Sequence, residues 1–203
     1  MTFLRRLLAV AAVLGLLAPS FAHAAPSPQS IIKEFYAQLV STMKQGEELG
    51  FSGRYEKLAP VIRASFNMPL MTRMSVGSGW SGASETERVD LIAAFSNFSI
   101  STYANRFASY DDEAFIVTGQ NPSGKDVIVN TQLKPKKDDA VTLNYLMRLD
   151  EKGNYRIVDV YMNGTISELA TRRSEFSSIV RREGVPALIN MLEQKANQMG
   201  TLP

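Results

Sequence analysis

The hydrophobic period of this sequence changes twice, and this feature constrains the fold more than any other. From Ile31 to Phe107 apolar residues recur at the spacing of helices, whereas from about Tyr110 to Met162 they alternate with a period of two, as strands do. The helical spacing returns after Asn163-Gly164. Because helices precede and follow one continuous run of strands, the sequence predicts an α+β fold rather than an alternating α/β fold.

Four strands are expected in the central segment, separated by short stretches rich in turn-forming residues. Connections this short join neighbouring antiparallel strands, so we expect a meander. The third strand alternates most clearly, with the odd-numbered residues of Val141–Leu149 on one face, which predicts one buried face of the sheet. The expected strands are Glu113–Gln120, Asp126–Leu133, Ala140–Leu149 and Asn154–Met162.

Helices are expected before and after these strands. The stretch Ser84-Glu85-Thr86-Glu87 has the pattern of a capping box, and the long helix that it opens is expected to continue to Ser109. Asn67 stands two positions before a proline and is expected to cap a shorter helix. Two helices should follow the sheet, over Thr165–Arg182 and Pro186–Met199. The elements together predict a curved antiparallel sheet of about four strands covered by N-terminal and C-terminal helices.

The N-terminus has the pattern of a secretory signal peptide. Arg5 and Arg6 precede the apolar run Leu7–Leu17, and Ala22-His23-Ala24 fits the small-x-small rule of a cleavage site. The apolar run is too short to span a membrane. We therefore expect residues 1–24 to be a signal peptide that is cleaved after about Ala24, which places the mature protein in the periplasm.

Cleavage would change the composition in a way that excludes several functions. The chain has no cysteine, and its one histidine, His23, would leave with the signal. The remaining single domain, residues 25–203, would then lack the side chains of cysteine nucleophiles, Ser-His-Asp triads, disulfides and most zinc or copper sites. Its 20 acidic side chains would be balanced by equally many basic ones. The mature domain would therefore have no excess of positive charge with which to bind nucleic acid. We expect no metal and no cofactor.

Asp159 is the carboxylate whose position most needs an explanation, because it lies within an otherwise apolar strand. Strict alternation places it on one face with Ile157 and places Val160 and Met162 on the opposite face. The favoured interpretation is a residue that caps a helix or pairs with an arginine such as Arg173.

An enzyme is the alternative to that structural role of Asp159. On a cone-shaped fold of helices and sheet, Asp159 would act as the general base and Tyr145 would donate a hydrogen bond to an oxyanion. Without histidine in the mature domain, few other groups could transfer protons.

Aromatic residues and methionines accumulate on the elements around the sheet. Apolar and aromatic walls with few polar groups are typical of a pocket for an apolar ligand. The same pattern also describes an ordinary closed core, which would suit a scaffold protein that binds partners on its exposed faces. Periodicity alone leaves both possibilities open.

Spaced residues in both halves of the chain resemble the MlaC-like periplasmic lipid-binding proteins, also called the toluene-tolerance family. The first half of the resemblance consists of Trp80, Ser84, Glu87-Arg88, Leu91, Phe95, Thr102-Tyr103-Ala104 and Tyr110. The second half consists of Tyr155, Ile157, Asp159-Val160, Gly164, Ser167, Arg173, Phe176, Gly184, Leu188 and Leu192.

Two segments, Met162–Ala170 and Arg173–Ser178, look most like the hopanoid-associated HpnM-like branch of this family. Two departures from the general pattern support a branch. Asn67 stands where the phospholipid carriers tend to have Asp, and Arg172 stands where they tend to have Tyr.

The resemblance implies a periplasmic, non-enzymatic lipid carrier with no catalytic residues and no metal. Its apolar cavity would hold the tails of a hopanoid or phospholipid and leave the head group near the mouth. The implied partners are the lipid ligand, an inner-membrane lipid transporter of an ABC-type or related system and an outer-membrane lipid-handling partner, with transient membrane contact. The residues expected to line the cavity are Met74, Trp80, Phe95, Phe98, Tyr103, Phe115, Tyr145, Met147, Val160, Met162 and Phe176.

Overall fold

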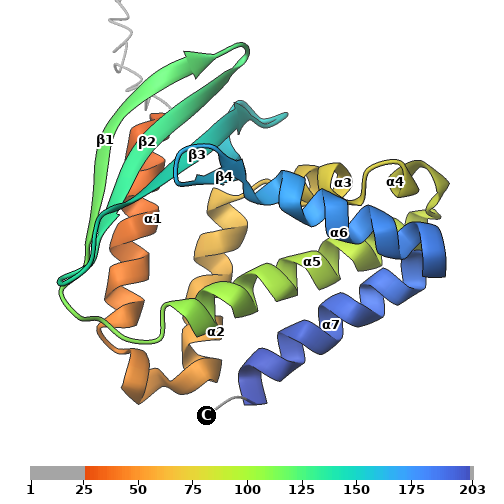
Figure 1. Cartoon of the computed structure of the whole chain (residues 1–203), viewed down its shortest axis with the longest axis horizontal. Coiled ribbons are helices and arrows are strands. Elements are labelled where there is room, and N and C mark those ends of the chain that lie inside the picture. The colour runs from red at the N-terminus through yellow and green to blue at the C-terminus, as the bar shows by residue number, and fades with distance from the viewer. Residues whose placement is uncertain (1–25, 202–203) are drawn as a thin grey trace, which may run out of the picture.

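The computed structural model describes residues 26–201, in which seven helices and five strands follow one another (Figure 1). The expected signal peptide lies outside the described residues. Within residues 26–201, no helix combines the length and the apolar character needed to cross a membrane. In chain order the elements are α1 (Pro28–Met43), α2 (Gly46–Ser65), α3 (Met68–Val76), α4 (Gly79–Gly82), α5 (Glu85–Arg106), β1 (Ala114–Ser123), β2 (Asp126–Lys134), β3 (Val141–Leu149), β4 (Tyr155–Met162), β5 (Ile166–Ser167), α6 (Glu168–Glu183) and α7 (Val185–Thr201).

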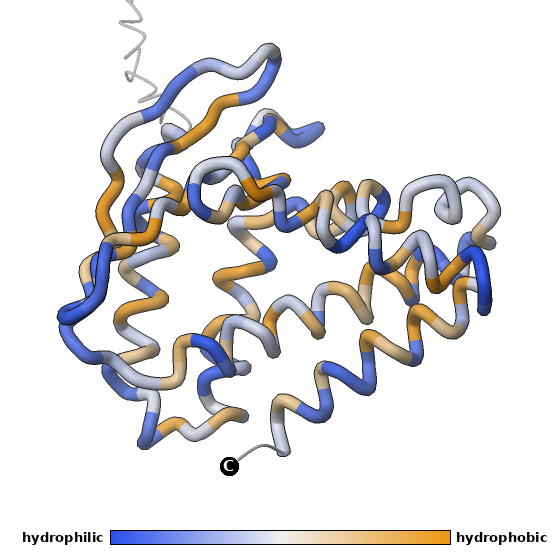
Figure 2. Tube along the Cα trace, viewed as in Figure 1, coloured by the Kyte–Doolittle hydropathy of each residue, from blue (hydrophilic) through white to orange (hydrophobic). Residues whose placement is uncertain are grey.

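The strands form one sheet in the order β1-β2-β3-β4-β5, and every neighbouring pair is antiparallel. The sheet is curved and open, with α1 and α2 against it and α5 and α7 running side by side away from it (Figure 1). Along these elements hydrophobic residues alternate with hydrophilic ones (Figure 2). The α+β class and the antiparallel meander are confirmed, and β5 is a short additional strand.

Helix α1 covers the face of the sheet that the alternation of β3 predicts to be buried. Tyr145 and Met147 of β3 are almost fully buried, and the Tyr145 ring meets the Phe35 ring of α1 at a centroid distance of 6.3 Å. The predicted burial fails at Leu149, which is 49% exposed at the end of the strand. We call this helix-covered face the inner face.

The turn between β1 and β2 is shorter than the sequence predicts. Strand β1 continues to Ser123, which pairs with Asp126, so only Gly124 and Lys125 form the turn. Gly124 has a φ of 61°, a conformation that tight hairpin turns require. Pro122 is tolerated inside β1 because β1 is an edge strand of the sheet.

Side-chain caps fix the starts of α3 and α5. Glu87 Oε2 accepts a hydrogen bond from the Ser84 N–H at 2.8 Å, and the Ser84 hydroxyl oxygen accepts one from the Glu87 N–H at 3.2 Å, so the predicted capping box is confirmed. Asn67 Oδ1 accepts from the Leu70 N–H at 3.1 Å, also as predicted. The Asn67 N–H donates to the Ile157 carbonyl of β4 at 2.9 Å, so α3 begins directly on the sheet.

Strand β4 contains a bulge that strict alternation does not anticipate. Ile157 pairs with Met147 of β3, but the neighbouring β3 residue Leu146 pairs with Asp159, which leaves Val158 as an additional residue. The extra residue shifts the alternation of β4 by one position.

Because of the bulge, Ile157 shares the inner face with Val160 and Met162. Val160 pairs with Tyr145, and Ile157 is fully buried. The expectation that Ile157 shares a face with Asp159 and lies opposite Val160 is therefore wrong, since strict alternation holds only in a strand without an inserted residue.

Asp159 connects the sheet to the start of α6. Its carboxylate accepts hydrogen bonds from the Ser167 hydroxyl at 2.6 Å, from the Leu169 N–H at 3.0 Å and from the Val160 N–H at 2.8 Å. The capping interpretation of Asp159 is confirmed, with Ser167 and backbone groups as partners rather than Arg173.

The enzymatic alternative needs Asp159 and Tyr145 to converge on a substrate, and the structure does not bring them together. Tyr145 pairs with Val160, the residue after Asp159, and successive residues of a strand point to opposite faces. Tyr145 therefore lies on the inner face, whereas the Asp159 carboxylate bonds to the start of α6.

Gly46, the first residue of α2, holds that helix against the end of α5. Arg54 Nη1 donates to the Gly46 carbonyl at 2.7 Å, and Arg54 Nε donates to the Ala104 carbonyl at 2.8 Å. A Cβ atom on Gly46 would lie 1.8 Å from the Ala108 carbonyl oxygen. Only glycine fits this contact without a backbone shift.

Gly46→Ala should therefore destabilise the fold by about 1–3 kcal/mol, because the Ala108 backbone must move. This loss corresponds to a fall in Tm of roughly 2–4 °C for each kcal/mol, which thermal unfolding followed by circular dichroism would detect. Gly82→Ala is the matched control, since a Cβ there has open space. Equal Tm values for the two variants would contradict the assigned contact.

Asp159→Ala should cost about 1–3 kcal/mol, because the buried Leu169 N–H loses its acceptor. Asp159→Asn should cost less, since an amide oxygen can still accept from Leu169 and Val160. Urea unfolding of both variants checks the order of stability. A native-like midpoint for Asp159→Ala would contradict the capping role.

Candidate functional site

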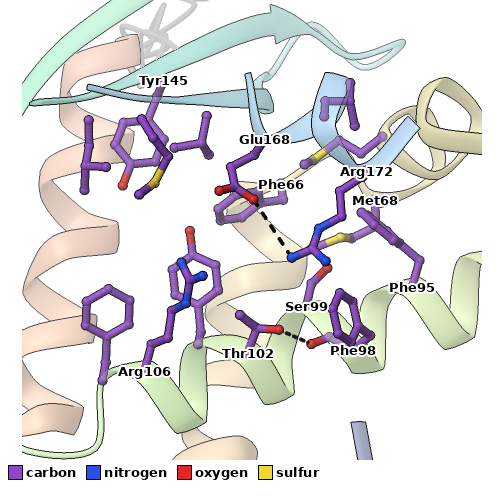
Figure 3. A pocket seen from close by; sticks show the side chains of 17 residues that line it. Phe66, Met68, Phe95, Phe98, Ser99, Thr102, Arg106, Tyr145, Glu168 and Arg172 are labelled. Atoms are coloured by element: carbon purple, nitrogen blue, oxygen red, sulfur yellow. Dashed lines mark hydrogen bonds and ion pairs between the residues drawn. The ribbon is translucent and has the colours of Figure 1, made fainter. Parts of the chain in front are cut away.

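A cavity of about 130 Å³ lies between α5, the start of α6 and the inner face of β3 and β4 (Figure 3). Phe66, which follows α2, and two methionines in the first turn of α3 complete its wall. The residues that line it are Phe66, Met68, Met71, Phe95, Phe98, Ser99, Thr102, Tyr103, Arg106, Phe107, Leu143, Tyr145, Val160, Met162, Glu168, Leu169 and Arg172.

One stripe of α5 forms the longest wall of the cavity. Its residues recur three or four positions apart, as residues on one face of a helix must. The stripe starts at the apolar Phe95, includes the exposed Arg106 at the last position of α5, and ends at Phe107, the residue that caps the helix. Its members are Phe95, Phe98, Ser99, Thr102, Tyr103, Arg106 and Phe107.

The opposite wall is the inner face of β3 and β4. Leu143 pairs with Met162 and Tyr145 pairs with Val160, so each pair presents two adjacent side chains to the cavity. The bulge in β4 places Val160 and Met162 on this face. The cavity is thus enclosed between the inner face of the sheet and one face of α5.

Aromatic rings form a continuous cluster at one end of the cavity. The Phe66 ring lies 5.7 Å from the Tyr103 ring and 5.5 Å from the Phe35 ring of α1, between centroids. The Tyr103 ring stacks on Phe107 at 5.6 Å. Contacts of this kind add to the burial energy of the rings, so this end of the cavity is firmly packed.

The phenols at this end carry no charge at neutral pH. Burial raises the pKa of Tyr103 and raises the pKa of Tyr145, with neighbouring tyrosines adding to both shifts. Tyr36 Oη lies 2.6 Å from Thr131 Oγ1, whose own hydroxyl donates to the Leu143 carbonyl, so Tyr36 is the donor to Thr131. The tyrosines of the lining, Tyr103 and Tyr145, are therefore neutral.

Three charged side chains also belong to the cavity lining. Arg172 Nη2 lies 3.9 Å from Glu168 Oε2, and its guanidinium carbon lies 4.7 Å from the centre of the Phe98 ring (Figure 3). The side chains of Arg172 and Glu168 are 23% and 34% exposed, and Arg106 is exposed. We call Arg106, Glu168 and Arg172 the charged mouth of the cavity.

The arrangement favours binding of an amphipathic molecule over chemistry. An apolar chain could lie between α5 and the sheet while a polar group stays at the charged mouth. In the part of the chain that the structure describes, no three His, Cys, Asp or Glu side chains come together as metal ligands. The cavity is similar in size to one of about 150 Å³ that holds a single benzene, so a long chain would have to widen it.

Several residues predicted from the sequence to bind lipid meet at this cavity. They come from α5, β3 and β4, the elements whose inner faces periodicity identifies. These residues are Phe95, Phe98, Tyr103, Tyr145, Val160 and Met162.

The other predicted residues lie outside the cavity lining. Met147 is fully buried in the core, and Phe176 of α6 packs edge-on behind Phe95 at 6.1 Å. Trp80 lies under the Arg88 guanidinium, 5.6 Å from it. Phe115 of β1 packs against α1, and Met74 of α3 is partly buried at the edge of the core. Periodicity identifies an inner face but does not separate a cavity wall from the core behind it.

The polar lining residues were not predicted from the sequence. Thr102 and Arg106 continue the stripe that starts at Phe95, so extending that stripe by helical spacing would have found them. Glu168 and Arg172 stand four positions apart, as a helical ion pair does, but nothing local shows that they reach α5.

Comparison with known proteins agrees with this architecture. The family model described as MlaC protein matches residues 33–194, most of the chain. A solved structure of similar fold is the phospholipid-binding protein from Ralstonia solanacearum in complex with a phospholipid. It is 19% identical, with a TM-score of 0.75 over 87% of this chain and 100% of that one. The chain belongs to the MlaC family.

Proposed function

We propose that this protein is a periplasmic carrier that binds a lipid and shuttles it between the inner and outer membranes. The observation that carries the proposal is a cavity lined mostly by aromatic and aliphatic side chains, with the charged side chains of Arg106, Glu168 and Arg172 also in its lining. A lipid has the same division into apolar tails and a polar head. Family membership and the lipid in the similar solved structure support this assignment.

The energetics explain why a carrier needs such a cavity. Exposing a lipid tail to water costs about 0.8 kcal/mol for each CH₂ group. A protein that takes lipid from one membrane to another must replace that burial with its own apolar surface. The rings and aliphatic side chains on α5, β3 and β4 provide this surface.

The cavity would have to expand when lipid enters. Its lining includes Met68, Met71 and Met162, whose flexible side chains can repack around an irregular ligand. A small cavity in the empty protein avoids the cost of a large dry void. Repacking of these methionines would allow loading without unfolding of the sheet.

The lipid class and the partners belong to the same proposal. The cargo is a phospholipid or a hopanoid, the latter suggested by the HpnM-like segments around Gly164 and Phe176. The proposed partners are an inner-membrane transporter of an ABC-type or related system and an outer-membrane lipid-handling complex. Export by the signal peptide, with residues 25–203 as a single lipid-binding domain, completes the proposal.

The protein purified without detergent from its native periplasm should carry lipid in stoichiometric amount. Native mass spectrometry gives the mass of the complex, and extraction followed by lipid mass spectrometry identifies the cargo as phospholipid or hopanoid. A lipid-free mass under the gentlest conditions would contradict the proposal.

Val160→Phe should weaken lipid binding, because the larger ring occupies space on the cavity wall. Displacing two or three methylenes of a bound chain would cost about 2 kcal/mol, or roughly 30-fold in Kd. Ile128→Phe is the matched control, since Ile128 pairs with Leu146 on the opposite face of the sheet. Equal lipid uptake from vesicles by the two variants would contradict the placement of the tails.

A further inference from the structure

Tyr103 of α5 brings a hydroxyl group to the aromatic part of the cavity lining. Its ring packs against the rings of Phe35, Phe66 and Phe107 at centroid distances of 5.6, 5.7 and 5.6 Å. These contacts fix the position of the phenol ring. A phenylalanine could make the same ring contacts, so the hydroxyl group needs an explanation of its own.

The two neighbouring tyrosines use their hydroxyl groups inside the protein. The Tyr36 hydroxyl donates to Thr131 Oγ1 at 2.6 Å, and the Thr131 hydroxyl donates to the Leu143 carbonyl. Tyr145 is hydrogen-bonded to Tyr36. Because Tyr36 already gives its proton to Thr131, Tyr145 is the donor in this bond. The three hydroxyl groups therefore form a chain in which every donor has its acceptor.

The Tyr103 hydroxyl is not part of this chain. Among the side chains of residues 26–201 that are not exposed, every enclosed nitrogen or oxygen atom has a hydrogen-bond partner. The Tyr103 hydroxyl forms no hydrogen bond with a described residue, so it is not enclosed. The open space beside Tyr103 is the cavity that this residue lines. Its hydroxyl is therefore a donor at the cavity surface without an acceptor in the described protein.

This donor lies between the aromatic lining and the charged mouth. Burial raises the pKa of Tyr103, and the nearby Tyr36 raises it further, so the hydroxyl keeps its proton at neutral pH. Arg106 lowers this pKa and Glu168 raises it, so both charged groups lie within electrostatic reach of the phenol. The ring itself is surrounded by other aromatic rings, where a charged ligand group would be costly to bury.

A ligand that enters the cavity has to accept from this hydroxyl or leave it without a partner. In a cavity of about 130 Å³ a water molecule has room to accept the hydrogen bond. A purely apolar chain would displace such a water and accept nothing, which weakens binding by roughly tenfold or more. A ligand with a neutral oxygen at this position would restore the bond.

We propose that the Tyr103 hydroxyl donates a hydrogen bond to a neutral oxygen of the cargo, an ester carbonyl or an alcohol, where the apolar body of the lipid meets its polar end. The carrier therefore selects lipids with such an oxygen over lipids of the same shape without it. This inference rests on the proposed lipid-carrier function and adds a selectivity that depends on neither the tails nor a charged head group.

The test uses two pairs of lipids whose members differ in this oxygen. The first pair is diacyl and dialkyl phosphatidylcholine with chains of equal length, since an ether linkage lacks the carbonyl. The second pair is the hopanoid alcohol diplopterol and the corresponding alkene diploptene. Vesicles contain either equal amounts of the first pair, or dialkyl phosphatidylcholine with equal amounts of the second. Uptake by the lipid-free mature protein is measured by mass spectrometry.

Tyr103→Phe removes the hydroxyl and keeps the ring contacts. Tyr155→Phe is the matched control, because Tyr155 is partly buried against the core and lies outside the cavity lining. Thermal unfolding verifies that both variants are folded. The comparison of lipids within each pair also tests the inference on the native protein alone.

The native protein and Tyr155→Phe should prefer the oxygen-bearing member of at least one pair by about tenfold. Tyr103→Phe should lose most of that preference. Its uptake of dialkyl lipid should not fall, since the substitution also removes the donor that this lipid leaves unpaired. A preference lost for the diacyl lipid identifies an ester carbonyl as the acceptor, and a preference lost for diplopterol identifies an alcohol.

Three outcomes would overturn the inference. The native protein could take up the two members of each pair equally, or the preference could persist unchanged in Tyr103→Phe. Tyr103→Phe could also lose uptake of all four lipids to the same extent, which would show that Tyr103 serves only the shape of the cavity. Uptake of none of the four lipids by the native protein would instead contradict the carrier function itself.

Discussion

The bulge at Val158 in β4 is the local feature on which the site depends most. It keeps Ile157 on the inner face together with Val160 and Met162, and it leaves Asp159 free to cap the start of α6. One inserted residue thus completes the apolar wall of the cavity and fixes the helix that carries Glu168 and Arg172. The hydrogen bond from Asn67 to Ile157 ties α3 to the same stretch of β4.

A carrier must satisfy two opposing requirements, because it has to stay folded when empty and still admit a large apolar ligand. An open void would cost stability in proportion to its volume. The cavity of about 130 Å³ keeps that cost small, while the methionines of its lining allow it to widen. The charged mouth adds polar groups to an otherwise mostly apolar lining, so an amphipathic ligand would bind with its polar group there.

Local signals predicted the fold well and the site only in part. The capping box at Ser84, the cap at Asn67 and the alternation of β3 all depend on neighbouring residues, so they can be identified in the sequence. The bulge cannot, since strict alternation continues through an inserted valine. The charged mouth contains Arg106 and Arg172, which are separated in the sequence by all the strands of the sheet. Only the tertiary fold places both in the lining of one cavity. The position of Phe176 could not be predicted either, because the hydrophobic pattern of a buried helix face is the same whether that face borders a cavity or the core.

A crystal structure of the protein loaded with its native lipid tests the central claim most directly. The account predicts acyl chains between α5 and the inner face of β3 and β4, with the lining methionines moved outward and the head group beside Arg106 and Arg172. Lipid bound elsewhere, for example in the groove between α1 and Phe115 of β1, with the cavity unchanged and empty, would contradict it.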